Sequence, residues 1–77
     1  MEEKLIAFGK RLKMLRKEKK QKQKDIADLL GIAERNYQRL EYGETNISAT
    51  NLIVLCDYFQ VSADFLLGRT EIREINR

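Results

Sequence analysis

The sequence contains no histidine and no proline, and it has one cysteine, Cys56, among its 77 residues. A disulfide within the chain is therefore impossible, and the paired-cysteine and histidine patterns of the common metal sites are missing. Histidine is also the side chain that most often serves as a general acid or base. No glycine-rich phosphate loop or paired-carboxylate motif stands in the sequence. We therefore expect no metal, no cofactor and no enzyme activity.

Long apolar runs are missing as well. Residues 1–8 lack the apolar core of a signal peptide, and no stretch approaches the roughly 20 apolar residues that cross a membrane. We expect a soluble protein of a reducing compartment, with no membrane partner. Nothing in the sequence indicates a small-molecule ligand either.

The residues that are abundant favour helices. Leu, Ile, Ala, Lys, Glu and Arg dominate the chain, and most of these have high helix propensity. A domain of this size buries only roughly 60 % of its unfolded surface, so its core must be packed efficiently. Without a repeat, a linker or a low-complexity segment, the sequence predicts one compact, all-α folding unit.

Apolar spacing and turn residues predict five helices. The first runs from Glu2 or Glu3 to Lys19, with Leu5, Phe8, Leu12 and Leu15 on its inner face and Ile6 and Met14 widening that stripe. The second covers residues 23–30 with Ile26, Ala27 and Leu30 inward, and the third covers residues 34–42 with Tyr37 and Leu40 inward. The fourth covers residues 49–59 and carries Leu52, Ile53, Leu55, Cys56 and Phe59, and the last is short, follows Ser62, and ends at Gly68.

Charge is distributed unevenly along the chain. Residues 1–24 carry a net charge of +7, whereas residues 25–77 carry −4. A concentrated basic region is typical of proteins that bind polyanions such as nucleic acids. A lysine-rich, solvated helix face would look the same, so charge alone leaves both interpretations open.

The segment Gln23-Lys-Asp-Ile-Ala-Asp-Leu-Leu-Gly-Ile-Ala-Glu-Arg-Asn-Tyr-Gln-Arg-Leu-Glu-Tyr-Gly43 resembles the helix-turn-helix of the phage Cro and cI repressor family, also called the xenobiotic-response-element type. The matching positions are Gln23, Ala27, Leu30, Gly31, Ile32, Leu40, Glu41 and Gly43. Residues 11–16 resemble the first-helix motif of the family, and residues 52–68 resemble its last two helices. The resemblance covers residues 8–69, and it implies a five-helix, lambda-repressor-like domain whose second and third helices form the helix-turn-helix.

This resemblance assigns roles to the core residues of the motif. It implies an ion pair between Arg16 and Glu41, which would fix geometry more than it stabilises. Three positions depart from the family pattern. Lys20 and Gln21 replace a glycine and an apolar residue, Ala33 replaces a Ser or Thr cap, and Glu44 stands where Lys or Arg is common. The first corner, the start of the reading helix and one phosphate contact are therefore expected to differ from the family.

DNA contacts are expected from the third helix and the segments around it. The side chains expected to read base edges in the major groove are Glu34, Arg35, Asn36, Gln38 and Arg39. The residues expected to hold phosphates are Lys22, Gln23, Lys24, Thr45, Asn46 and Ser48. Arginine suits guanine, Asn and Gln suit adenine, and Glu can accept from cytosine. Tyr37 matches a core position, so we expect its ring to pack inside.

The resemblance implies a DNA-binding transcriptional regulator in the cytoplasm, bacterial or phage-encoded. We expect a repressor that binds a pseudo-palindromic operator as a weak homodimer. The expected DNA-binding domain comprises residues 1–69, and residues 70–77 form a tail that is either disordered or involved in dimerisation. The candidate dimer residues are Phe65, Leu67, Ile72 and Ile75; the alternative for Phe65 is a place wholly in the core.

One other function remains open from the sequence. An antitoxin or another protein-interaction module can use the same fold, because the residues that specify the fold do not themselves contact DNA. Cys56 lies on the apolar face of the fourth helix, where a buried and inert thiol is expected rather than a nucleophile.

Overall fold

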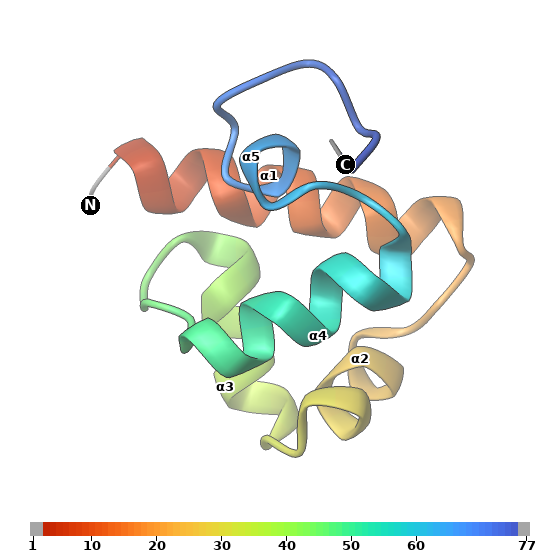
Figure 1. Ribbon diagram of the computed structural model, residues 1–77. Helices are drawn as coiled ribbons and strands as arrows, with labels where there is room; N and C mark the ends of the chain where they lie inside the picture. The colour runs from red at the N-terminus through yellow and green to blue at the C-terminus, as the bar shows by residue number, and fades with distance from the viewer. Residues whose placement is uncertain (1–2, 76–77) are drawn as a thin grey trace.

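The computed structural model describes residues 3–75, and these form five α-helices without a strand. Their bounds are α1 Glu3–Glu18, α2 Gln23–Leu30, α3 Glu34–Tyr42, α4 Ala49–Phe59 and α5 Ala63–Leu66 (Figure 1). The all-α, five-helix prediction is confirmed, and α2, α3 and α4 have the predicted bounds. The first helix ends at Glu18, one residue before the prediction, and a start at Glu2 lies outside the described residues.

The helices surround one core. Contacts are most extensive between α1 and α3 and between α2 and α3. Figure 1 shows α1 spanning one side of the molecule, α2 on the opposite side, α3 running from α2 toward α1, and α4 crossing in front of α3. This arrangement leaves α2 and the start of α3 together at the end away from α1. None of the helices within residues 3–75 is long and apolar enough to span a membrane.

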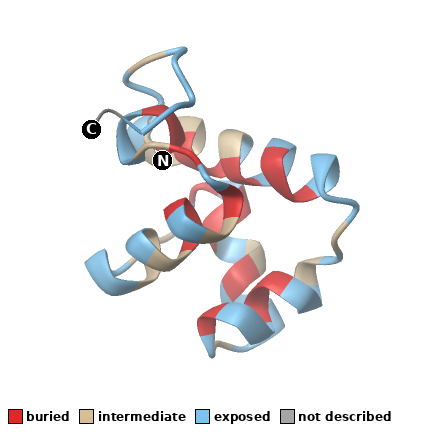
Figure 2. Cartoon of the chain, turned by 45° about the vertical axis from the view of Figure 1, so that its right-hand side comes forward, coloured by how far each residue is buried: buried red, intermediate tan, exposed pale blue. Residues whose placement is uncertain are grey.

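The core draws on every helix. The buried apolar residues are Phe8, Leu12, Leu15, Ile26, Ala27, Leu30, Tyr37, Leu40, Leu55, Cys56, Phe59, Val61, Phe65 and Leu66. Figure 2 shows the buried positions gathered on the helix faces that point toward the centre. Two apolar residues of these helices face solvent. Ile53 is 61 % exposed, and Met14, predicted to widen the inner stripe of α1, is 36 % exposed.

The helix ends have local causes. Gly31 and Gly43 end α2 and α3 in the left-handed conformation, with φ of 69° and 75°, a region that glycine occupies without strain. Ser48 and Ser62 cap α4 and α5 by accepting hydrogen bonds from Asn51 N and Phe65 N. Ala33 begins α3 without any side-chain cap, as the departure from the family pattern predicts.

The corner between α1 and α2 turns at Lys20. Lys20 has a φ of 57°, a left-handed value that is unusual for a residue other than glycine. Its backbone N–H bonds to Lys17 O at 2.9 Å, and Gln21 N bonds to Arg16 O at 3.1 Å. The chain thereby closes α1 and turns toward α2.

Gly9 lies where α1 crosses α3 most closely. A Cβ atom at this position would stand 2.3 Å from Glu41 O and 2.7 Å from Leu40 O. Since these are backbone atoms, no side-chain rotation can make room. The absence of a side chain at Gly9 therefore sets how closely α3 is held against α1.

Residues 70–75 fold back onto the helices (Figure 1). Arg73 forms two hydrogen bonds with the Glu18 carboxylate, at 2.7 and 2.8 Å, and its carbonyl accepts from Ser62 N at 2.7 Å. Arg11 bonds to Glu71 at 2.8 Å. Residues 70–75 therefore pack against the helices of their own chain. Residues 76 and 77 lie outside the residues that the structure describes.

Candidate nucleic-acid interface

The turn between α2 and α3 holds the two helices in a fixed relation. Ala27 is 1 % exposed on the inner face of α2, so a larger side chain there would push α3 away. Gly31 turns the chain, and Ile32 packs its partly buried side chain against the core. α3 is thus presented with one face in the core and the other in solvent.

The outer face of α3 carries the side chains expected to read bases. Glu34, Arg35, Asn36 and Arg39 are exposed, and Gln38 is half-buried. Tyr37, by contrast, is fully buried. The structure therefore places the five polar residues on the solvent side of α3 and removes the Tyr37 ring from it; the other aromatic residue of α3, Tyr42 at its end, is 62 % exposed.

A pair of glutamines links the start of α2 to the middle of α3. Gln38 Nε2 donates to Gln23 Oε1 at 3.1 Å, and Gln23 Nε2 donates to Glu41 Oε1 at 3.1 Å. A candidate base-reading side chain and a candidate phosphate-binding side chain are therefore held by one another, and both are anchored to the core through Glu41.

Glu41 is the centre of a buried polar network. It accepts from Arg16 Nε at 2.6 Å and from Arg16 Nη2 at 3.1 Å, and the Tyr37 hydroxyl also donates to it. Arg16 Nη1 reaches Gln21 O at 3.0 Å, at the corner between α1 and α2. Among residues 3–75 no buried side-chain polar atom lacks a hydrogen-bond partner. The network connects α1, α2 and α3 behind the exposed face.

The titration behaviour of this network follows from its hydrogen bonds. Burial alone would raise the pKa of Glu41, but the bonds from Arg16, Tyr37 and Gln23 outweigh it and hold that pKa below its ordinary value. The bond to Glu41 raises the pKa of Arg16 despite burial. Burial and the same carboxylate raise the pKa of Tyr37 well above its usual range. At neutral pH, Arg16 and Glu41 are therefore charged and the Tyr37 phenol is neutral.

The residues expected to hold phosphates flank α3. Lys22, Lys24, Asn46 and Ser48 are exposed, and Gln23 and Thr45 are half-buried. Lys22 N donates to Asp25 Oδ2 at 2.8 Å, which fixes the start of α2. Lys24 is engaged by Asp28 at 3.1 Å, and this bond raises the pKa of its ammonium group.

Two of the side chains expected to contact DNA already interact with another residue of the chain. Arg39 Nε lies 3.9 Å from Glu44 Oε1, so the acid that replaces a basic residue of the family pattern partly neutralises a candidate base reader. The Ser48 hydroxyl accepts from Asn51 N at 3.1 Å, so it is committed to capping α4. Phosphate contact at this point would use other atoms, such as the backbone N–H groups at the start of α4.

Comparison with known proteins assigns the family. The helix-turn-helix family model HTH_3 matches residues 12–66, which is most of the chain. The chain belongs to the helix-turn-helix family of the Cro/cI type.

Relatives of this helix-turn-helix chain occur in Bacillus subtilis strain 168. The SPbeta prophage-derived uncharacterised HTH-type transcriptional regulator YonR is 40 % identical over 63 residues, which is 82 % of this chain and 58 % of the relative. The HTH-type transcriptional regulator ImmR is 32 % identical over 71 residues, which is 92 % of this chain and 56 % of the relative. The chain therefore spans a little over half the length of the curated relatives it matches.

Two solved structures share the arrangement of the helices. The restriction-modification controller protein C.AhdI from Aeromonas hydrophila has 31 % identity and a TM-score of 0.71, over 80 % of this chain and 94 % of that one. A transcriptional regulator from Listeria innocua has 34 % identity and a TM-score of 0.78, over 91 % of this chain and 64 % of that one. The lambda-repressor-like fold predicted from the motif thus agrees with structures of regulators.

The candidate dimer residues of the helix-turn-helix domain fall in different environments. Phe65 is 3 % exposed, and the guanidinium groups of Arg11 and Arg73 lie 4.3 and 5.2 Å from its ring centroid. Its side chain lies in the core, which is the alternative that the sequence left open for Phe65, and the dimer alternative is not supported for this residue. Leu67 is half-buried, whereas Ile72 and Ile75 are exposed.

Sequence reasoning missed one exposed apolar residue on this side. Ile53 and Ile75 line the same shallow pocket, together with Cys56 and Val61. Only the packing of α4 against α5 and the tail reveals that Ile53 faces outward. Burial raises the pKa of the Cys56 thiol, which is the inert state expected of it. Residues 3–75 contain no cluster of three or more candidate metal ligands.

Proposed function

We propose that this chain is a sequence-specific, double-stranded DNA-binding transcriptional regulator that inserts α3 into the major groove. The observation that carries the proposal is the outer face of α3. Arg35, Asn36, Gln38 and Arg39 stand there together, with the ring of Tyr37 turned into the core. Side chains with donors and acceptors in fixed planes are those that distinguish base pairs in the major groove.

Preorganisation supports this assignment. Gln38 is held by Gln23, and Gln23 by the buried Glu41. A side chain already held in place loses less conformational entropy when it contacts a base. The same chain of hydrogen bonds ties the position of α3 on a base edge to the position of α2 on the phosphate backbone.

Phosphate contacts would come from both sides of the reading helix. Lys22 and the N-terminus of α2 supply positive charge on one side, and Thr45 and Asn46 precede α4 on the other. Contacts of this kind fix the register of a protein on the duplex without reading its sequence. Lys24 would have to leave Asp28, so its contribution is expected to be smaller.

The chain would act as a homodimer on a pseudo-palindromic site, with repression by occlusion of a promoter as its effect. Two reading helices in a symmetric dimer contact successive major grooves, roughly 34 Å apart. Exposed Ile53, Ile72 and Ile75 supply the apolar surface for a weak contact between copies, and the half-buried Leu67 is retained as a candidate. The regulators among its relatives favour a bacterial or phage-encoded protein that works in the cytoplasm.

The test is selection from random duplex DNA at near-physiological salt. Wild type should enrich a short inverted repeat, and the Arg35→Ala/Arg39→Ala variant should lose it. The matched control is Lys13→Ala/Lys17→Ala, which removes the same charge from exposed positions on α1. This control should keep the wild-type site, with its affinity reduced only by the general loss of positive charge.

The outcomes separate the alternatives. Equal enrichment by wild type and the arginine variant would show that α3 does not read bases. If the lysine control loses the site as completely as the arginine variant, binding is a matter of charge and not of base reading. If wild type enriches no site and instead co-purifies with a specific protein, the chain is an antitoxin or interaction module with this fold.

A further inference from the structure

An apolar pocket of the molecule lies away from the outer face of α3. It is a pocket of about 710 Å³ between the start of α1, the loop before α4, and the end of α5. This volume falls within the roughly 300–1,000 Å³ of pockets that hold small organic ligands. None of the proposed base-reading residues lines it.

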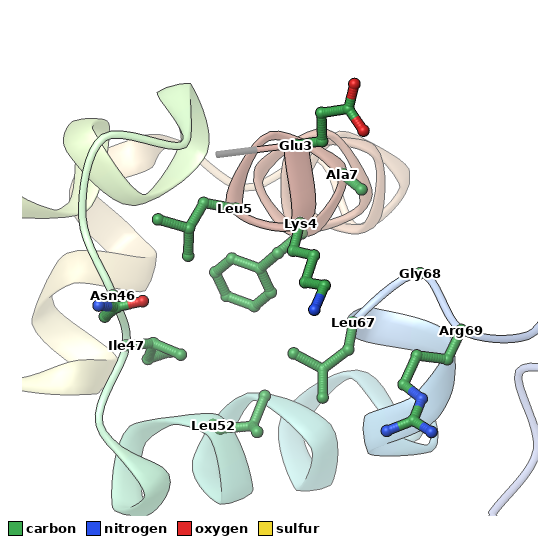
Figure 3. Close-up of a pocket in the computed structure, with 11 residues that line it drawn as sticks. Glu3, Lys4, Leu5, Ala7, Asn46, Ile47, Leu52, Leu67, Gly68 and Arg69 are labelled. Carbon is green, nitrogen blue, oxygen red and sulfur yellow. The ribbon is translucent and has the colours of Figure 1, made fainter. Parts of the chain in front are cut away.

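The walls of this pocket are mostly apolar. The apolar lining residues are Leu5, Ala7, Phe8, Ile47, Leu52 and Leu67. Figure 3 shows the side chains of Leu5, Ile47, Leu52 and Leu67 directed into one common space from α1, the loop, α4 and the end of α5. A ligand with an apolar body would therefore remove these side chains from water, which is the main driving force for such binding.

The charged groups at the pocket have one predominant sign. Lys4 extends its ammonium group into the pocket on the side of Leu67, Arg69 stands at the rim, and the Glu3 carboxylate points away (Figure 3). Among residues 3–75, no carboxylate lies within ion-pair distance of Lys4, and Arg69 reaches Asp64 only at 4.0 Å. An anionic group would thus meet the Lys4 ammonium group at the pocket and a second cation at its rim.

We propose that this pocket binds an amphipathic organic carboxylate, with its apolar chain among the leucines and its carboxylate at Lys4 and Arg69. The complementary charge selects an anion over a neutral or cationic molecule of the same shape. The proposal concerns reversible binding and includes no covalent step.

The position of the pocket gives such a ligand a consequence. Asn46 and Ile47 form one wall, and Asn46 is also a candidate phosphate-binding residue. A ligand that fixes Ile47 holds this loop in one conformation, and an effector acts through a difference in affinity between conformations. The bound carboxylate would therefore change the affinity for DNA, a consequence that rests on the proposed function.

Binding is tested without DNA, by methyl NMR titration of the full chain with decanoate below its micelle-forming concentration. Saturable shifts are expected at Leu5, Ile47, Leu52 and Leu67, and none at Ile53 and Ile75. Decanol serves as the neutral probe with the same apolar body. Absence of saturable shifts, or equal shifts at Ile53 and Ile75, overturns the site.

The charge assignment is tested with one substitution and its control. Lys4→Gln should weaken decanoate binding by about 1.4-fold to fivefold, the range for an exposed ion pair, and leave decanol unchanged. Lys13→Gln removes an equivalent charge from α1 outside the pocket and should change neither. If Lys4→Gln binds decanoate as wild type does, the pocket does not select carboxylates.

The proposed effect of the ligand on DNA binding is tested by measuring DNA affinity with and without decanoate. The affinity of wild type for its selected DNA site should change by about fivefold or more when decanoate saturates the pocket. An unchanged DNA affinity with a saturated pocket overturns the coupling. Failure to bind DNA even without decanoate refutes the proposed function instead, and the NMR result then stands or falls on its own.

Discussion

At the residue scale, the tightest constraint is the missing side chain of Gly9. Replacement by alanine puts a Cβ atom 2.3 Å from Glu41 O, and α1 and α3 must then move apart. Overpacking costs about 1–3 kcal/mol. The higher helix propensity of alanine offsets about 1 kcal/mol of this cost. Because the clash is with backbone, we expect Gly9→Ala to lower the free energy of unfolding by about 2 kcal/mol, measured by urea denaturation.

Gly31→Ala is the comparison for that measurement. A Cβ atom there meets nothing within 4 Å, and only the left-handed φ of 69° opposes it, at a cost of about 1–2 kcal/mol. A Gly9→Ala protein as stable as wild type would mean that α1 does not approach α3 as closely as described.

Glu41 is the other residue on which the fold depends, and its effect varies with pH. Its pKa is lowered in the folded protein, so the ionised form stabilises the fold above the unfolded pKa of about 4.3. That contribution is lost as the pH falls through the lower, folded pKa. At pH 7 we expect Glu41→Gln to be clearly less stable than wild type, with the difference narrowing below about pH 4.3.

Urea denaturation of both proteins between about pH 2 and 7 makes this comparison. The other carboxylates, including Glu18 with its lowered pKa beside Arg73, titrate in both proteins and largely cancel in the difference. A difference between wild type and Glu41→Gln that stays constant across this range would contradict the role given to the Arg16–Glu41 pair.

At the scale of single helices, the start of α3 lacks the side-chain cap that stabilises the start of α4. Ala33 has φ and ψ of −67° and 147°, nearly the values of −71° and 154° at Ser48, but only Ser48 caps its helix. Ala33→Ser should therefore form the missing cap and raise the free energy of unfolding by about 1 kcal/mol. Ser48→Ala should lower it by a similar amount in the same thermal or urea experiment. An Ala33→Ser protein no more stable than wild type contradicts the prediction.

The helices were predictable because their signals are local. Glycine after α2 and α3, serine before α4 and α5, and apolar spacing between them depend only on neighbouring residues. Exposure of Ile53 was not predictable, since it depends on which face of α4 the neighbouring elements cover. The burial of Phe65 between two arginines and the constraint at Gly9 likewise arise from segments distant in the sequence.

The candidate site divides in the same way. Exposure of Arg35, Asn36 and Arg39 followed from the period of α3 and the family motif. The sequence did not predict the bond between Gln23 and Gln38 or the contact of Glu44 with Arg39. Each of these depends on the distance between two side chains in the folded protein. Sequence therefore indicated which residues face outward, and the structure showed which of them are already engaged.

At the scale of the whole molecule, residues 70–75 contact the helices through Glu71 and Arg73. Arg73 holds Glu18 and covers Phe65, so Arg73→Ala should lower the melting temperature at low salt. Because the Arg73–Glu18 pair is exposed, added salt should reduce the difference from wild type. Arg69→Ala, whose contact with Asp64 is at 4.0 Å, is the control with a smaller effect. Equal melting temperatures for wild type and Arg73→Ala would show that the tail does not stabilise the domain.

Only some of the lysines in this molecule are proposed to contact phosphates. The salt dependence of DNA affinity distinguishes these lysines from the others. Lys22 begins α2 beside the reading helix, whereas Lys13 is exposed on α1 and no phosphate role is proposed for it. Each phosphate contact contributes about −0.9 to the slope of log affinity against log salt. Lys22→Gln should therefore reduce the steepness of that slope by about 0.9 per protomer, and Lys13→Gln should leave it near the wild-type value. The slopes come from fluorescence anisotropy with the selected DNA site. Equal slopes for the two variants would mean that the positive charge of residues 1–24 acts as a diffuse field, without a defined phosphate contact at the start of α2.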